Sequence, residues 1–291
     1  MIAVMIWLVL IVVGLALGSF VNALIWRLHE QEVITDKKKL TKADRVRLQR
    51  LSISKGRSMC LSCGHELAAK DLIPIVSWLW LRGKCRYCSA RIPDSPLSEV
   101  AVPTLLVLSY TWWPWSLVST FNWVLFGLWG ICIVSFVALA LYDLRWYLLP
   151  NRIVFPLVVA ALAFRFVLGL QADSGQLSMW LSGLWGAALL AGLFYLLFII
   201  SNEQWIGGGD VKLAMALGLL AGGPLATLLL LFLASTTGTL AAVPLLLQGK
   251  SVRHARIPFG PFLILATIIT VLFSQSIINW YIGLFSLTNH L

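Results

Sequence analysis

Long apolar segments, separated by short polar stretches, make up most of the sequence. About 20 apolar residues in a helix are enough to cross a hydrocarbon core of about 30 Å. The segment at 211–220 is shorter than this, but neighbouring helices can shield a half-length helix from lipid. The other segments predict transmembrane helices at residues 2–26, 98–118, 121–142, 152–170, 178–200, 225–247 and 258–286. The pattern therefore predicts an all-α polytopic membrane protein with about eight transmembrane helices.

Composition narrows the class further. Of the 291 residues, 59% are hydrophobic and only 12% are charged. Soluble domains carry about 25% charged residues, because polar groups must cover their surface. The composition therefore excludes a soluble enzyme, a disordered chain and a disulfide-stapled secreted module.

The charged residues are concentrated in one part of the chain. Residues 27–99 hold 15 of the 22 lysines and arginines and 8 of the 12 acidic residues, which predicts a water-facing insert. We therefore expect a first transmembrane helix at 1–26, a polar domain at 27–97 and a membrane-embedded domain at 98–291. The first helix is expected to stay as an anchor, since no basic stretch precedes it as in a secretory signal.

Basic residues in short loops indicate the cytoplasmic side of a membrane protein. With the polar domain in the cytoplasm, eight segments place the loops 143–152, 201–210 and 248–257 on that same side. The basic residues of these loops are Arg145, Arg152, Lys250, Arg253 and Arg256. The opposite loops hold no lysine or arginine, so we expect both termini outside. Arg165, near the outer end of a predicted span, is expected to extend to the lipid headgroups.

Cys60, Cys63, Cys85 and Cys88 form two C-x2-C pairs with 21 residues between them. Such pairs hold zinc tetrahedrally through four thiolates at about 2.3 Å, and a filled shell indicates a structural ion. A reducing cytoplasm disfavours disulfides, and the βαβ pattern of a redox C-x-x-C motif is absent from the sequence. His65 is either a substitute ligand or a solvated loop residue.

The basic character of the polar domain raises the question of nucleic-acid binding. Residues 37–57 lack interleaved aromatic residues and a recognisable reading element, so we expect no nucleic-acid partner. A solvated helix beside anionic headgroups explains the charge of Lys37–Arg50 equally well. The apolar segment Ile73–Leu81 is too short to span. We expect it either to pack beneath the cysteine pairs or to lie at the membrane interface, where tryptophan is favoured.

Two aspartates lie at the predicted cytoplasmic boundary of the membrane. Asp143 ends one span, and Asp210 begins another directly after three glycines, which permit an extended substrate to approach closely. Two adjacent carboxylates share one proton, so the ionised one can activate water while the protonated one polarises a carbonyl. This chemistry hydrolyses peptides without a metal or a covalent intermediate. In the structural alternative, Asp210 is a helix N-cap and Asp143 pairs with Arg145.

Serine or cysteine proteolysis has little support in the sequence. Cys132 is isolated in an apolar span, where a packed thiol is the usual role. None of the four histidines has an evident nucleophile partner.

Taken together, these features resemble the type IV prepilin peptidases (prepilin leader peptidase/N-methyltransferases), a family of GxGD membrane aspartic proteases. The resemblance covers nearly the whole chain and depends on several motifs in the same order. The motifs are Gly18–Asn22 with Arg27-Leu28, the paired cysteines, Pro74–Trp78 with Arg82–Cys85, Pro96–Glu99, Asp143 with Pro150-Asn151, Gly207–Lys212 and Ile257–Phe262.

The resemblance implies that Asp143 and Asp210 are the catalytic pair and that the four cysteines bind Zn²⁺ in a cytoplasmic domain. It implies removal of the basic leader of prepilins and pseudopilins at the cytoplasmic face of the bacterial inner membrane. Many members then N-methylate the new N-terminus with S-adenosylmethionine, although no residue of this sequence marks the donor site. Lys212 is expected to position Asp210, and Pro258–Phe262 to shape the entry to the last span.

Two other functions remain open at this stage. In the first, the chain is a transporter or channel with a zinc-stabilised cytoplasmic regulatory domain, and its aspartates relay ions. The spans offer few polar residues for such a path besides Asn22, Ser135 and Thr236–Thr239. In the second, the chain is a zinc-stabilised assembly platform without catalysis. The sequence gives no indication of oligomeric state.

Overall fold

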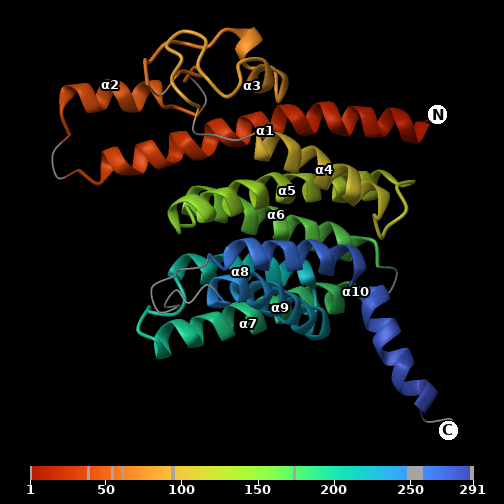
Figure 1. Cartoon of the computed structure of the whole chain (residues 1–291). Helices are drawn as coiled ribbons and strands as arrows, with labels where there is room; N and C mark the ends of the chain where they lie inside the picture. The colour runs from red at the N-terminus through yellow and green to blue at the C-terminus, as the bar shows by residue number, and fades with distance from the viewer. Residues whose placement is uncertain are drawn as a thin grey trace. The chain divides into compact units, whose positions relative to one another are not determined.

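The computed structural model describes residues 2–37, 40–53, 56–60, 62–92, 96–172, 175–247 and 258–288. Within these ranges the chain is helical or irregular, apart from two isolated antiparallel bridges, Met59–Glu66 and Lys84–Arg91. The predicted all-α fold is therefore confirmed. The elements are α1 (Ile2–Thr35), α2 (Lys42–Arg50), η1 (Ala69–Asp71), α3 (Val76–Trp80), α4 (Leu97–Thr111), α5 (Thr120–Trp146), α6 (Asn151–Leu170), α7 (Gln176–Ile200), α8 (Gly208–Ala221), α9 (Pro224–Leu247) and α10 (Gly260–Thr288) (Figure 1).

Six of the described helices, α1, α5, α6, α7, α9 and α10, are long and apolar enough to cross a membrane. The other two predicted segments are also helical, as α4 with 15 residues and α8 with 14. The chain is thus a multi-pass membrane protein. The boundaries that differ most from expectation are the end of α1, which continues to Thr35 instead of 26, and the end of α4, which lies at Thr111 instead of 118. Pro114 explains the early end of α4, since the residues before a proline disfavour helix.

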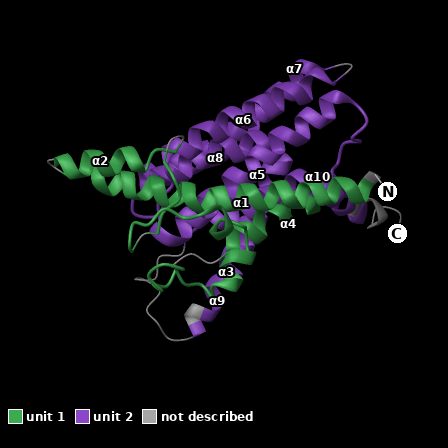
Figure 2. Cartoon of the chain, turned by 90° about the horizontal axis from the view of Figure 1, so that it is seen from above, with its two compact units in different colours: residues 1–108 green, residues 109–291 purple. Residues whose placement is uncertain are grey.

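The described chain divides into two compact units, residues 1–108 and residues 109–291, here called unit 1 and unit 2 (Figure 2). In unit 1, the first turn of α4 packs against α1. The Ser98 hydroxyl donates to the Gly18 carbonyl at 2.8 Å, and a Cβ at residue 18 would collide with the α4 backbone. Gly18 is therefore required by the closeness of these two helices.

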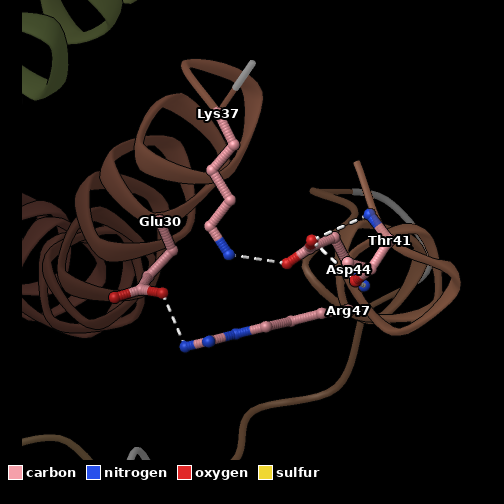
Figure 3. A network of polar contacts seen from close by, with 5 residues as sticks. All are labelled: Glu30, Lys37, Thr41, Asp44 and Arg47. Atoms are coloured by element: carbon pink, nitrogen blue, oxygen red, sulfur yellow. Dashed lines mark hydrogen bonds and ion pairs between the residues drawn. The ribbon is translucent and has the colours of Figure 1, made fainter. Parts of the chain in front are cut away.

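The polar extension of α1 pairs with α2 through side chains (Figure 3). Lys37 binds Asp44 at 2.7 Å, and Arg47 binds Glu30 at 2.7 Å. Thr41 caps α2, where its hydroxyl accepts from the Asp44 N–H while the Asp44 carboxylate accepts from the Thr41 N–H. The charges of this stretch thus serve an intramolecular helix pair, and they explain why α1 remains helical beyond its apolar part.

Unit 2 is a bundle in which large aromatic side chains fill the interior. Trp129, Phe136 and Tyr142 of α5 and Phe164 of α6 are fully buried. The short helix α8 packs against α6, α7, α9 and α10. Its residues from 213 to 221 are buried apart from Met215, so neighbouring helices shield the half-length segment as the sequence predicts.

Arg165 does not extend to the lipid headgroups, and that expectation is wrong. Its side chain is buried, and it donates hydrogen bonds to the carbonyls of Leu219 at 2.5 Å and Leu220 at 3.0 Å. These carbonyls belong to the last turn of α8, where intrahelical donors run out. A helix that ends inside a bundle must satisfy those groups internally, and a cation there also complements the helix dipole.

Candidate active site and metal centre

Asp143 lies in the last turn of α5 and is buried. The helix ends where Tyr147 adopts a left-handed conformation with φ 55° and returns its N–H to the Asp143 carbonyl at 2.9 Å. The Asp143 carboxylate in turn accepts a hydrogen bond from the Gly260 N–H at the start of α10, at 3.1 Å. The carboxylate is therefore oriented by the backbone of a different helix.

Asp210 lies in the first turn of α8, where its N–H donates to the Gly207 carbonyl at 3.0 Å. The N-cap is Gly207, so the alternative in which Asp210 caps the helix is wrong. The side chain is half-buried. It lies in the first turn of α8, at the positive end of the helix dipole.

The structure brings the two aspartates together, although 67 positions separate residues 143 and 210 in the chain. α10 packs against both α5 and α8. The carboxylates are close enough for the charge of Asp210 to act on Asp143. Within unit 2, the end of α5 and the start of α8 thus lie at the same end of the bundle.

Lys212 lies on the same helix as Asp210, two residues further on. Its ammonium group donates to the Asn151 side-chain oxygen at 3.0 Å, which ties the start of α8 to the start of α6. Arg165 links α6 to the other end of α8, so the two helices run in the same direction. The contact fixes the first turn of α8, which also carries Asp210, and the positioning of Asp210 by Lys212 stays a prediction.

Gly260 is the site residue that sequence reasoning missed. The motif Pro258–Phe262 was expected only to shape the entry to the last span, yet its glycine contacts Asp143. A Cβ at residue 260 would lie 2.6 Å from Oδ2 of Asp143, so any side chain there would displace the carboxylate. The available signal was a glycine between Phe259 and Pro261 at the start of an apolar segment.

In unit 1, the four cysteines converge at one point. Their sulfur atoms all lie within 4.8 Å of one another, and Cys60 Sγ is 3.7 Å from Cys88 Sγ. Each C-x2-C pair forms a tight turn: the Cys60 N–H donates to the His65 carbonyl, and the Cys85 N–H donates to the Ala90 carbonyl. The two turns are built alike, and each is closed by one of the isolated bridges.

The arrangement of the sulfur atoms fits a tetrahedral ion. Four Zn–S bonds of about 2.3 Å give S···S edges of about 3.8 Å, which matches the Cys60–Cys88 distance. His65 is not part of the cluster, because its ring packs on Tyr87 with centroids 3.7 Å apart. The predicted clustering of the cysteines is confirmed, and these residues can hold a metal.

Electrostatics in the cysteine cluster favour unequal ionisation. Burial opposes a charge on Cys60, but hydrogen bonds from the backbone of Cys63 and Ser62 outweigh it and lower the pKa of Cys60 to about 6. For Cys88, a backbone hydrogen bond from Ala90 favours the thiolate, but burial and the neighbouring sulfurs raise its pKa to about 12. The cluster therefore resists carrying several negative charges, and a divalent cation would remove that resistance.

Asp71 fastens the second cysteine turn to η1. Its carboxylate accepts from Arg86 Nε at 2.7 Å and from the Tyr87 hydroxyl at 3.2 Å. The Arg86 hydrogen bond is the main reason that the pKa of Asp71 is lowered from its ordinary value. This contact holds Cys85 and Cys88 in place through the residues between them.

Unit 1 also contains a cavity of about 240 Å³ beside the cysteine cluster. Trp26 and Glu30 of α1, Trp78 of α3 and Glu99 of α4 are among the residues that line it. Its lining also includes Arg27, Arg50, Arg57, Arg86 and Arg91, so aromatic rings, carboxylates and guanidinium groups surround the same space.

Comparison with known proteins shows the family of this chain. The chain matches the model of the type IV leader peptidase family over residues 130–243, and the model of the bacterial peptidase A24 N-terminal domain over residues 12–113. The chain belongs to the type IV leader peptidase family.

Curated relatives agree over most of their length. A prepilin leader peptidase/N-methyltransferase of Aeromonas salmonicida is 32% identical over 93% of this chain and 91% of the relative. Proteins of the same name are 30% identical in Pseudomonas aeruginosa, over 94% of this chain and 92% of the relative, and 31% identical in Bacillus subtilis, over 80% and 88%. No solved structure matches the chain. The transporter or channel alternative receives no support from these relatives.

Proposed function

We propose that this chain is a membrane aspartic endopeptidase that removes the leader peptide of type IV prepilins and pseudopilins. The observation that carries the proposal is the meeting of Asp143 and Asp210, which come from separate helices and interact electrostatically at one end of unit 2. The family of the chain and the names of its relatives support the same activity.

In the proposed mechanism, the two carboxylates share one proton. The ionised carboxylate takes a proton from a water molecule as the water oxygen attacks the scissile carbonyl, while the other carboxyl gives its proton to the carbonyl oxygen. A proton then passes to the leaving amine as the C–N bond breaks. The Gly260 N–H holds the Asp143 carboxylate in one orientation throughout, which maintains the geometry that this chemistry needs.

We propose that the site faces the cytoplasm from the bacterial inner membrane. The basic loop residues support this orientation, because Lys and Arg accumulate on the cytoplasmic side. Arg145 in the last turn of α5 and Arg152 in the first turn of α6 stand on either side of the loop between these helices, shortly after Asp143. A leader that carries positive charge would meet the aspartates on this side.

The cysteine cluster is proposed to bind structural Zn²⁺. Its four sulfurs fill a tetrahedral shell, so the ion would have no open position for substrate. The ion would hold the two cysteine turns together and support the folding of residues 56–92.

The relatives' names include an N-methyltransferase activity, and we propose that this chain also uses S-adenosylmethionine. The cavity of unit 1 is the candidate site, because Trp26 and Trp78 offer rings to a sulfonium cation and the arginines of its lining offer hydrogen-bond donors to the carboxylate of the same molecule. The donor would supply a methyl group to the new N-terminus. Equilibrium dialysis of the full chain with labelled donor tests this, and we expect Trp78→Ala to weaken binding while zinc content is unchanged.

The peptidase is tested with the full chain in lipid nanodiscs and a synthetic prepilin, by mass analysis of the product. Asp143→Asn and Asp210→Asn should abolish the loss of the leader while zinc content and thermal unfolding remain those of the parent. Glu203→Gln is the matched control, because it removes an exposed acidic charge from the loop before α8. Cleavage by either aspartate variant at the parent rate would overturn the proposal.

A further inference from the structure

The short helix α3 of unit 1 has two unlike faces. Trp78 is turned inward, where its ring lies next to Gly83 and lines the cavity. Val76, Leu79 and Trp80 are 55%, 61% and 80% exposed, and their spacing puts them on one side of the helix. Leu72 and Ile73, just before the helix, are exposed as well. We call these five residues the α3 face.

The position of α3 along α1 identifies what lies next to this face. The Ile75 N–H donates to the Glu99 carboxylate in the first turn of α4 at 2.5 Å, and that turn packs on α1 at Gly18. α3 and α1 also line the same cavity, with Ser19, Asn22, Ala23, Trp26, Arg27 and Glu30 on the α1 side. These contacts cover the last turns of the apolar part of α1 and continue past Arg27, its first charged residue, to Glu30.

The part of α1 that lies next to α3 is at the boundary of the membrane. The apolar part of α1 covers 2–26, which is about 37 Å of helix, while a hydrocarbon core is about 30 Å thick. The last turns of that stretch therefore lie in the headgroup region, and α3 is beside them. Apolar side chains exposed at this depth face lipid, and tryptophan is the residue most typical of the interface.

The charges around α3 suit an anionic lipid surface. Residues 72–92 contain four basic side chains, Arg82, Lys84, Arg86 and Arg91, and no acidic one. Arg86 is paired with Asp71, and Arg82 and Lys84 are exposed directly after the helix. An apolar face next to basic residues is the pattern of a segment that lies in the membrane interface.

We propose that the α3 face is a membrane-binding surface, which inserts Val76, Leu79 and Trp80 into the interface of the leaflet where α1 leaves the membrane. The α3 face thereby gives the cysteine cluster and the cavity a third attachment to the membrane, in addition to the helices α1 and α4. This inference rests on the contacts within unit 1 and does not depend on the peptidase activity.

Photocrosslinking of the full chain in nanodiscs tests the proposal. A benzophenone amino acid replaces Leu79, and mass analysis identifies adducts after irradiation. Val9 in the apolar part of α1 is 60% exposed and serves as the lipid-facing reference, while Val46 on α2 is 52% exposed and serves as the solvent-facing one. We expect lipid adducts at Leu79 with a yield similar to that at Val9, and none at Val46.

The lipid composition provides a second readout. Anionic phosphatidylglycerol in the discs should raise the yield at Leu79 about fivefold over purely zwitterionic discs, the effect of about one surface cation. Val76 provides a repeat position on the same face if the Leu79 variant does not fold. A Leu79 position that gives no lipid adducts, or that crosslinks to protein instead, would show that something other than the membrane covers the α3 face.

Discussion

The N–H of Gly260 donates to Oδ2 of Asp143 at 3.1 Å, and this bond joins the start of α10 to the end of α5. The bond is direct because Gly260 has no side chain. A Cβ at this position would come within 2.6 Å of the carboxylate oxygen. The glycine thus allows the backbone of one membrane helix to orient the acid of another, and the motif around it becomes part of the candidate site.

Gly260→Ala is expected to lower the rate of prepilin cleavage. The added methyl group must push the Asp143 carboxylate aside, and a displacement of about 1 Å at a catalytic group costs about 100-fold in rate. We expect kcat to fall while KM changes little, because the substitution touches the acid and not the substrate. The measurement is the initial rate at several prepilin concentrations in nanodiscs.

Gly127→Ala is the control for this substitution. Gly127 lies on α5, the helix that carries Asp143, and a Cβ there would have nothing within 4 Å. Equal kcat in the two variants would mean that the Gly260 contact does not orient a catalytic acid.

Arg165→Leu is expected to destabilise unit 2. The substitution leaves the carbonyls of Leu219 and Leu220 inside the bundle without these hydrogen bonds, at a cost of about 1–3 kcal/mol for an unsatisfied buried group. Thermal unfolding in nanodiscs should move to lower temperature, and Arg165→Lys should recover part of the loss because an ammonium group still donates.

Arg152→Leu makes the same chemical change at an exposed position of α6, so its unfolding temperature should remain near that of the parent. If Arg165→Leu unfolds no earlier than Arg152→Leu, the arginine does not stabilise the end of α8.

The sequence was sufficient to predict the helical segments and the cysteine cluster. Apolar length marks a membrane helix regardless of its neighbours, so all eight predicted segments are helical in the structure. The spacing of the cysteines is local, so the two C-x2-C pairs could be assigned to one metal site before the fold was known. The end of α1 was predicted too early because its polar part pairs with α2, a contact that apolar patterns do not reveal.

The contacts of Gly260 and Arg165 could not be predicted from the sequence, and the reason is physical. The partner of Arg165 is a pair of backbone carbonyls, and a backbone group has no signature in the amino-acid pattern. Gly260 likewise contributes only its N–H. Loop charges predict membrane depth, which placed Asp143 and Asp210 at one level, but the packing of α10 against both of their helices had to come from the structure.

Removal of the metal is expected to act on unit 1 first. Without a cation, the thiolates repel one another and the two cysteine turns lose their common anchor. A strong chelator should therefore increase hydrogen exchange in residues 56–92, while α5 and α8 in unit 2 keep their protection. Cys88→Ser should reproduce the effect without chelator, and Cys132→Ser should not, because Cys132 is buried in α5 of unit 2 and is not a member of the cluster. Unchanged exchange in residues 56–92 after zinc is removed would contradict a structural ion.

Acid is expected to loosen the pairing of α1 with α2. The hydrogen bond from Lys37, followed by those from Thr41, holds the pKa of Asp44 well below its usual range. A group whose pKa is lowered by folding stabilises the folded state above its unfolded pKa of about 4, and this contribution disappears as the pH falls further. Hydrogen exchange in residues 42–50, corrected for the intrinsic effect of pH, should therefore increase as the pH drops below about 4.

Asp44→Asn should show the faster exchange already at pH 7, because an amide cannot form the ion pair with Lys37. If exchange in the variant equals that of the parent at both pH values, the ion pair contributes nothing and Thr41 alone caps the helix.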